Sequence, residues 1–149
     1  MHRRWFVFFL FILSMLPFAS GMAAEHASTF SKISLKIGKT AIQVELAKTE
    51  SQRAKGLMFR THLGVNSGML FDFGAPAKVC MWMKNTYIPL SVAFIDQDGV
   101  IVNIENMEPL TIDSHCSNGL VRYALEMNHG WFVTRKISPG GKVKGFRPD

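Results

Sequence analysis

The chain has 149 residues, 48% of them apolar and 19% charged, and its formal net charge is +6. This length suits a single domain, and this apolar fraction is large enough for a hydrophobic core. The basic residues are scattered along the chain and do not form a cluster interleaved with aromatic residues, so a nucleic-acid-binding surface is not expected.

The first 24 residues have the pattern of a secretory signal peptide. A short basic start precedes the apolar run Trp5–Phe18, which is shorter than the roughly 20 residues of a membrane-spanning helix. Small residues follow, so we expect cleavage after Gly21, Ala23 or Ala24. A cut after Ala24 is the least favoured because it places Met22 at the third position before it. The alternative is an uncleaved N-terminal anchor.

The mature chain is therefore expected to comprise residues 25–149 and to work in the periplasm or outside the cell, with no membrane contact after cleavage. Its formal charge is +4, because Arg3 and Arg4 are removed with the signal peptide. In an oxidising compartment its two cysteines, Cys80 and Cys116, can form a disulfide. The sequence does not supply their separation, so free thiols remain the alternative. Neither cysteine lies in a C-x-x-C pair, and a thioredoxin-type role has little support.

The first half of the mature chain predicts a hairpin followed by a short helix. Apolar and polar residues alternate on both sides of Gly38 and Lys39, which is typical of two strands joined by a tight turn. Thr49 and Gln52, three residues apart, predict a helix N-terminus with a capping box, and Gly56 predicts the end of that helix.

The middle of the chain predicts further strands. The apolar runs Gly68–Phe73 and Val79–Met83 are expected to be buried strands. Two β-rich segments flank Asp96–Gly99, which has the composition of a hairpin turn. This turn also resembles the opening of a calcium loop, but the later ligands of such a loop are missing, so we interpret it as a turn.

A polar loop is expected from Glu108 to Gly119. A strand over Leu120–Met127, a short helix or turn within Asn128–Ile137 and a last strand over Lys142–Phe146 follow it. The whole pattern predicts a mainly β fold, a compact antiparallel sandwich or barrel-like domain of about eight short strands with one or two short helices.

Four segments, in this order and spacing, resemble the bacterial and archaeal family called domain of unknown function 192: Gly56–Arg60, Gly68–Phe73, Met81–Asp96 and Tyr123–Gly130. The resemblance spans nearly all of the mature chain. It implies a compact, mainly β, sandwich-like domain that is often exported, and it carries no established reaction. The family commonly has an acidic residue where this chain has Ser91.

Polar residues appear together where the run Val79–Met83 ends. One interpretation is a ligand pocket at the rim of the sandwich, in which Arg60, Lys84 and Asn85 bind a small polar or anionic ligand and Glu126 opposes them. The structural alternative is a turn in which Asn85 is left-handed, Thr86 bonds its own backbone and Lys84 pairs with an acid.

Catalytic patterns are poorly represented. Asp72 and Glu126 are candidates for the paired carboxylates of a small hydrolase or lyase acting on envelope polysaccharide, although their separation is not readable from the sequence. Asp113, Ser114 and His115 are the residue types of a catalytic triad, but sequence neighbours seldom face one another as a nucleophile and its base must. Whether the chain is an enzyme stays open, and we favour a protein that is not.

Copper handling is a further alternative. Met81 and Met83 lie on one face of the expected strand, and two thioethers could bind Cu(I) with His115 or His129 completing the site. Methionine is also an ordinary filler of cores, which is the interpretation we favour. We therefore predict an exported binding or accessory module for a small polar or anionic ligand or an envelope component, with no cofactor and no metal.

Overall fold

The computed structural model describes residues 29–146. The expected signal peptide and its cleavage site lie outside these residues. Within them, no helix is long and apolar enough to cross a membrane.

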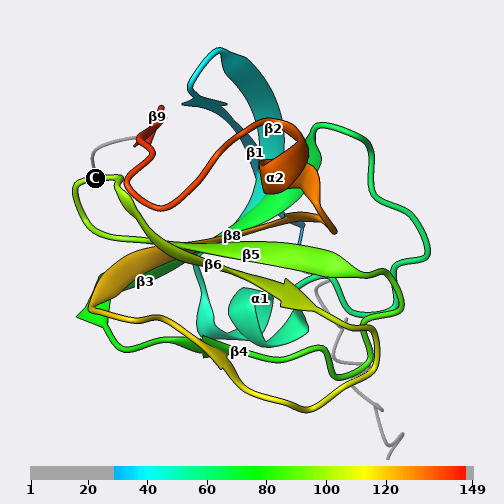
Figure 1. Cartoon of the computed structure of the whole chain (residues 1–149). Coiled ribbons are helices and arrows are strands. Elements are labelled where there is room, and N and C mark those ends of the chain that lie inside the picture. The colour runs from blue at the N-terminus through cyan, green and yellow to red at the C-terminus, as the bar shows by residue number, and fades with distance from the viewer. Residues whose placement is uncertain (1–28, 147–149) are drawn as a thin grey trace, which may run out of the picture.

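Eleven elements make up the described chain. In order they are β1 (Ser31–Ile37), β2 (Thr40–Ala47), α1 (Glu50–Lys55), β3 (Ser67–Ala77), β4 (Cys80–Met81), β5 (Leu90–Ile95), β6 (Ile101–Met107), β7 (His115–Cys116), β8 (Val121–Asn128), α2 (Trp131–Thr134) and β9 (Val143–Lys144). Seven strands form one curled sheet in the order β6-β5-β8-β3-β2-β1-β9, and β4 and β7 form a separate ribbon. Figure 1 shows α1 and β4 on one side of the large sheet and α2 on the other.

The mainly β fold class is confirmed, with nine strands and two short helices. One pairing differs from the expected antiparallel arrangement, because β2 and β3 are parallel. A parallel pair cannot be joined by a tight hairpin and needs a crossover connection. Residues 48–66, which include α1, make that crossover and bring α1 against the sheet.

The local turn and cap predictions are confirmed. β1 and β2 form an antiparallel hairpin around Gly38, whose φ of 57° suits glycine. At the start of α1 the Gln52 amide donates to Thr49 Oγ1 (3.2 Å) and the Thr49 amide donates to Gln52 Oε1 (3.1 Å), which is a capping box. The helix ends at Gly56 with a φ of 48°.

The large sheet is buried on both faces along its central strands. All six residues of β5 are buried, and most of β8 is buried as well. Leu125 belongs to a core that includes Trp131 and Phe132 of α2, whereas its neighbour Ala124 belongs to a second core that includes Phe71. Side chains alternate between faces along a strand, so neighbouring residues of β3 and β8 enter different cores.

The prediction of a buried strand over Val79–Met83 is wrong in part. β4 covers only Cys80 and Met81, and although Val79 and Met83 are buried, Trp82 is 54% exposed. β4 pairs with the two-residue β7 and with no strand of the large sheet, so the ribbon does not continue as a buried strand and the Trp82 side chain stays at the surface.

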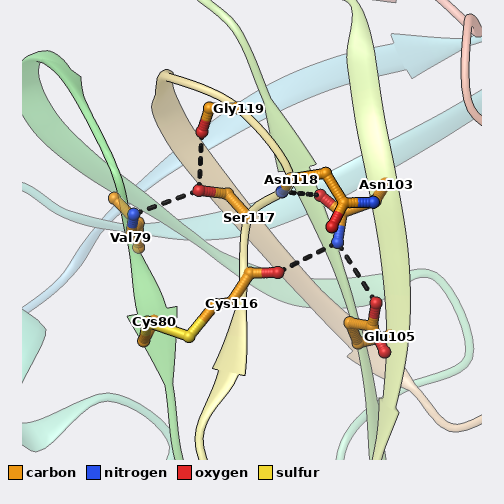
Figure 2. Close-up of a disulfide and its surroundings, with 8 residues drawn as sticks. All are labelled: Val79, Cys80, Asn103, Glu105, Cys116, Ser117, Asn118 and Gly119. Atoms are coloured by element: carbon orange, nitrogen blue, oxygen red, sulfur yellow. Dashed lines mark hydrogen bonds between the residues drawn. A yellow bond between two sulfur atoms is a disulfide. The ribbon is translucent and has the colours of Figure 1, made fainter.

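The predicted disulfide is present, and it joins opposite residues of β4 and β7 (Figure 2). β7 lies within the segment that the sequence predicted to be a polar loop. Ser117 Oγ accepts a hydrogen bond from the Val79 amide (3.1 Å), and Asn103 Nδ2 of β6 donates to the Cys116 carbonyl (3.1 Å). The ribbon is therefore tied to the large sheet by side-chain bonds as well as closed by the Cys80–Cys116 bond.

Candidate functional site

A pocket of about 150 Å³ lies between α1, β3, β8 and β4. Its apolar walls are formed by Met58, Phe71, Phe73, Met81 and Trp82, and its polar side chains are Arg53, Lys55, Thr86 and Glu126. A cavity of this volume accommodates a molecule of about the size of benzene. The pocket can thus hold one ring or a short alkyl chain, with polar groups in reach.

Glu126 is the buried polar group of this pocket. It lies on the central strand β8, opposite Met69 of β3 and Val92 of β5, and only 4% of it is exposed. No side chain in the described part of the protein donates a hydrogen bond to it. Within residues 29–146 no fully enclosed side-chain oxygen lacks a partner, so the carboxyl oxygens retain access to the pocket.

Burial raises the pKa of Glu126 from its ordinary value of 4.5 to about 8. The charged form is disfavoured because the surrounding side chains solvate it poorly. At neutral pH the group is therefore mostly a protonated carboxylic acid. In that form it can donate one hydrogen bond and accept others.

Arg53 supplies a positive charge at the same pocket. Its Nη1 donates to the carbonyl oxygens of Lys48 and Asp72, and its guanidinium carbon lies 5.6 Å from the centroid of the Phe73 ring. These contacts orient the guanidinium without cancelling its charge, because main-chain carbonyls carry no net charge. With Lys55 also in the lining and Glu126 protonated, the pocket carries positive charge at neutral pH.

Three loop segments near the pocket are joined by main-chain hydrogen bonds. The Phe59 amide donates to the Asn85 carbonyl (2.8 Å). The Leu110 amide donates to the Thr86 carbonyl (3.1 Å), and the Met83 amide donates to the Thr111 carbonyl (3.1 Å). Five of the eight exposed large hydrophobic residues of the described chain lie on these segments. They are Phe59, Trp82, Tyr87, Leu110 and Ile112.

Two of these exposed residues have an unusual backbone conformation. Phe59 and Leu110 both have a φ of 63°, a region that bulky side chains rarely adopt. Phe59 also packs edge-on against Tyr87, with ring centroids 6.1 Å apart. Strained residues persist where the surrounding structure holds them, and they are concentrated at functional sites. Both residues carry an exposed apolar side chain, and Phe59 follows Met58 of the pocket lining.

The sequence pattern of the family DUF192, described as "Uncharacterized ACR, COG1430", matches residues 33–145. The chain belongs to this family. Among curated proteins, none matches the sequence.

Two solved structures resemble this DUF192 domain. A Sinorhizobium meliloti protein described as a candidate transcription regulator is 41% identical, with a TM-score of 0.76, over 78% of this chain and 95% of its own. A Novosphingobium aromaticivorans protein described as of unknown function is 35% identical, with a TM-score of 0.75, over 82% of this chain and 91% of its own.

The four predicted ligand-binding residues do not come together in this DUF192 domain, and only one of them lines the pocket. Glu126 lines the pocket, whereas Arg60 binds both carboxylate oxygens of Glu45 (2.7 and 2.6 Å), and this bond raises the pKa of Arg60. Lys84 is exposed, with its Nζ 5.8 Å from the centroid of the Trp82 ring. Arg60 is therefore held by its own ion pair away from the pocket lining.

The turn interpretation of Lys84–Thr86 describes most of the observed geometry. Asn85 has a φ of 57°, and Thr86 Oγ1 donates to the Lys84 carbonyl (3.4 Å). The partner of Lys84 is the Trp82 ring rather than an acid. Of these turn residues, only Thr86 reaches the pocket lining.

The DUF192 domain does not bring Asp72 and Glu126 together. Asp72 alternates with Phe71 and Phe73 along β3, so it projects from the opposite face to the one that lines the pocket. There it accepts hydrogen bonds from Arg122 Nε (3.2 Å) and the Gly74 amide (2.8 Å). This arrangement suits a structural ion pair.

The two methionines proposed for copper lie in different environments. Met83 is fully buried in the second core, whereas Met81 lines the pocket beside Met58. Within the described range, no three His, Cys, Asp or Glu residues lie close enough to hold a metal ion.

Sequence reasoning missed the contributions of Arg53, Phe73 and Trp82. A signal for Phe73 was available, since it follows Phe71 at the two-residue spacing of one strand face. Arg53 lies in the last turn of α1, where a basic residue is ordinary, and only the crossover from β2 to β3 brings that turn to the pocket.

Proposed function

We propose that this exported DUF192 domain is a binding module that takes a small anionic molecule with an apolar part into the pocket above Glu126. The observation that carries the proposal is a buried carboxyl group, without a hydrogen-bonding side chain among the described residues, that lines a pocket together with a cation. Buried polar groups are normally hydrogen-bonded, and an unpartnered one that faces a pocket needs an explanation. A ligand that accepts its proton in a hydrogen bond provides one.

The chemistry of the ligand follows from the lining. Arg53 and Lys55 attract negative charge, and protonated Glu126 donates to an oxygen such as that of a carboxylate or phosphate. Phe71, Phe73 and the other apolar residues contact an apolar body of about one ring. An ammonium ligand is disfavoured, because it would meet two cations and a neutral acid.

Export is part of the same proposal. The expected signal peptide motivates it, and the Cys80–Cys116 disulfide is compatible with it because disulfides persist in oxidising compartments. The carboxylate-pair hydrolase receives no support from the opposite faces of Asp72 and Glu126. Transcription regulation, named for the Sinorhizobium meliloti protein, has no support from a recognition helix here, because the helices of residues 29–146 have only six and four residues.

The test uses three probes of equal size and different charge. The purified mature chain is titrated with benzoate, benzyl alcohol and benzylamine by calorimetry at pH 6.5, with tryptophan fluorescence of a Trp131→Phe variant, in which Trp82 remains, as a second readout. We expect benzoate to bind most tightly and its affinity to fall above a pH of about 8, where Glu126 loses its proton. Tighter binding of benzylamine would contradict the proposed charge of the pocket.

Variants assign the binding to the pocket. Glu126→Leu removes the hydrogen-bond donor and Arg53→Met removes the cation, and each is expected to weaken benzoate binding by roughly tenfold or more. Glu126→Gln keeps an N–H donor and should retain most of the affinity. Lys78→Met removes an exposed charge outside the pocket lining and serves as the control. Unchanged binding in both pocket variants would exclude this site.

A further inference from the structure

A second concave surface shares no lining residue with the pocket above Glu126. It is a groove of about 460 Å³ between β1, the segment after α2 and β9. Figure 1 shows this last segment, in orange and red, running from α2 to β9 at the β1–β2 hairpin. Four lysines line the groove, and we call it the lysine groove: Lys36, Lys136, Lys142 and Lys144.

Two of these lysines are held directly opposite each other. Lys36 of β1 pairs with Lys144 of β9, and the neighbouring pair is Ile37 with Val143. Val143 is 2% exposed and belongs to the first core, so its burial sets the register of this short strand. Like charges at opposite positions of an antiparallel pair destabilise it. The core contact of Val143 thus forces a charge repulsion at the surface.

Residues 29–146 offer little to relieve this repulsion. No acidic residue lines the groove, and no ion pair between a carboxylate and any of its four lysines occurs within residues 29–146. Val100 pairs with Lys142, and two acids, Asp96 and Asp98, lie in the turn just before Val100. Asp96 is engaged within that turn, where its Oδ1 accepts from the amides of Asp98 (2.9 Å) and Val100 (2.8 Å).

The backbone conformation of Lys136 fixes the direction of the chain at the groove. It has a φ of 57°, which is uncommon for a residue other than glycine, and the amide of the next residue, Ile137, donates back to the Phe132 carbonyl (3.0 Å). This conformation ends α2 and turns the chain into the lining of the groove. Four cations from three segments therefore surround one hollow, although the repulsion among them opposes the fold.

We propose that the lysine groove is a binding site for a ligand that carries two or more phosphate groups. Ammonium groups bind phosphate oxygens as compact point charges, and several of them around one hollow suit a multiply charged anion. The volume of the groove is three times that of the pocket above Glu126, which leaves room for two phosphates. Such a ligand would neutralise the repulsion between Lys36 and Lys144. Free diphosphates and phospholipid headgroups share this chemistry.

The first experiment measures thermal unfolding of the mature chain with pyrophosphate, and with sodium chloride at the same ionic strength. We expect pyrophosphate to raise the midpoint and chloride to raise it much less, because a specific ligand stabilises the folded state by binding to it. Equal shifts would mean that salt screening alone acts on the lysines, and would overturn the proposal.

Variants give a signature that a merely exposed lysine would not give. Lys36→Gln combined with Lys144→Gln should weaken pyrophosphate binding by roughly tenfold or more. The same change should raise the unfolding midpoint without ligand at low salt, because the repulsion is removed. The control, Lys32→Gln with Lys78→Gln, removes two exposed charges outside the groove and should leave the affinity within about twofold. An unchanged affinity in the groove variant would overturn the proposal.

A binding experiment with lipid vesicles distinguishes a phospholipid headgroup from a free diphosphate as the ligand. Sedimentation with phosphatidylcholine vesicles, with and without cardiolipin, tests a lipid headgroup, since each cardiolipin headgroup carries two phosphates. Cardiolipin-dependent sedimentation that is lost in the Lys36 and Lys144 variant would identify a lipid ligand. Pyrophosphate binding without sedimentation would identify a soluble one. If neither probe binds, the groove is not a phosphate site.

Discussion

Lys84 lies over the ring of Trp82 at the surface of the molecule, with its Nζ 5.8 Å from the ring centroid. Trp82 is 54% exposed, although it follows directly after β4. The indole therefore acts as an outer wall of the pocket above Glu126 and contributes little to either core.

Trp82→Ala is expected to lower the free energy of unfolding by about 1 kcal/mol, measured by urea denaturation. A buried tryptophan would cost about 3–5 kcal/mol, which is what a strand buried throughout Val79–Met83 would imply. Lys84→Ala should cost less than about 1 kcal/mol, because this cation–π contact is exposed. A loss of 3 kcal/mol or more for Trp82→Ala would show that the indole is enclosed in solution.

The stability of the protein should fall as the pH rises from about 4.5 to about 8, the two pKa values of Glu126 in the unfolded and folded chain. In this window the unfolded chain has lost a proton that the folded chain keeps, so the unfolded state binds fewer protons and a rise in pH favours it. The stabilisation that Glu126 contributes is fully present below the lower pKa and is lost above the higher pKa. Its upper limit is on the order of 4–5 kcal/mol.

Glu126→Gln isolates this effect from other titrating groups. The amide has nearly the same shape and cannot ionise, so the difference in unfolding free energy between variant and wild type should favour the variant increasingly between pH 5 and pH 8. Urea denaturation at four pH values across this range measures it. A difference that stays constant with pH would mean that Glu126 titrates alike in the folded and unfolded chain.

Arg60 and Glu45 should show a coupling of about 1 kcal/mol in a double-mutant cycle with Arg60→Met and Glu45→Gln. Both side chains are partly buried, at 30% and 21% exposure, and the pair has two parallel hydrogen bonds. The coupling should decrease in high salt, because part of it is electrostatic. A coupling below about 0.3 kcal/mol would show that this pair stabilises the fold no more than an ordinary surface ion pair does.

Loss of the Cys80–Cys116 bond should destabilise the protein by about 4 kcal/mol, since the bond closes a loop across 36 residues and restricts the unfolded chain. Urea denaturation of Cys80→Ser combined with Cys116→Ser measures the loss. Alkylation under denaturing, non-reducing conditions should label no cysteine in the wild type. Two labelled cysteines would contradict the bond.

Mass spectrometry of the periplasmic or secreted fraction should find a mature chain that begins between Met22 and Glu25. Small residues precede these positions and follow the apolar run, which is the arrangement that signal peptidases cleave. A chain in that fraction that still begins at Met1 would support the uncleaved anchor instead.

Local signals in the sequence were sufficient for much of the fold. The family, the mainly β class, the hairpin at Gly38, the capping box of Thr49 and the turn at Asp96–Gly99 all depend on residues that are close in sequence. Turn and cap preferences act over a few bonds, so the residues themselves determine them. The Cys80–Cys116 bond was predictable because the expected export favours a disulfide and two cysteines have one possible pairing.

The tertiary structure decided which residues reach the pocket. Period-two alternation groups Phe71 with Phe73 and separates both from Asp72, but it does not say which face of a strand meets a core, a pocket or solvent. The parallel pairing of β2 with β3 brings Arg53 to Glu126, and Arg60 meets Glu45 across the same crossover. These contacts join residues far apart in sequence, so they form only when the whole sheet is assembled.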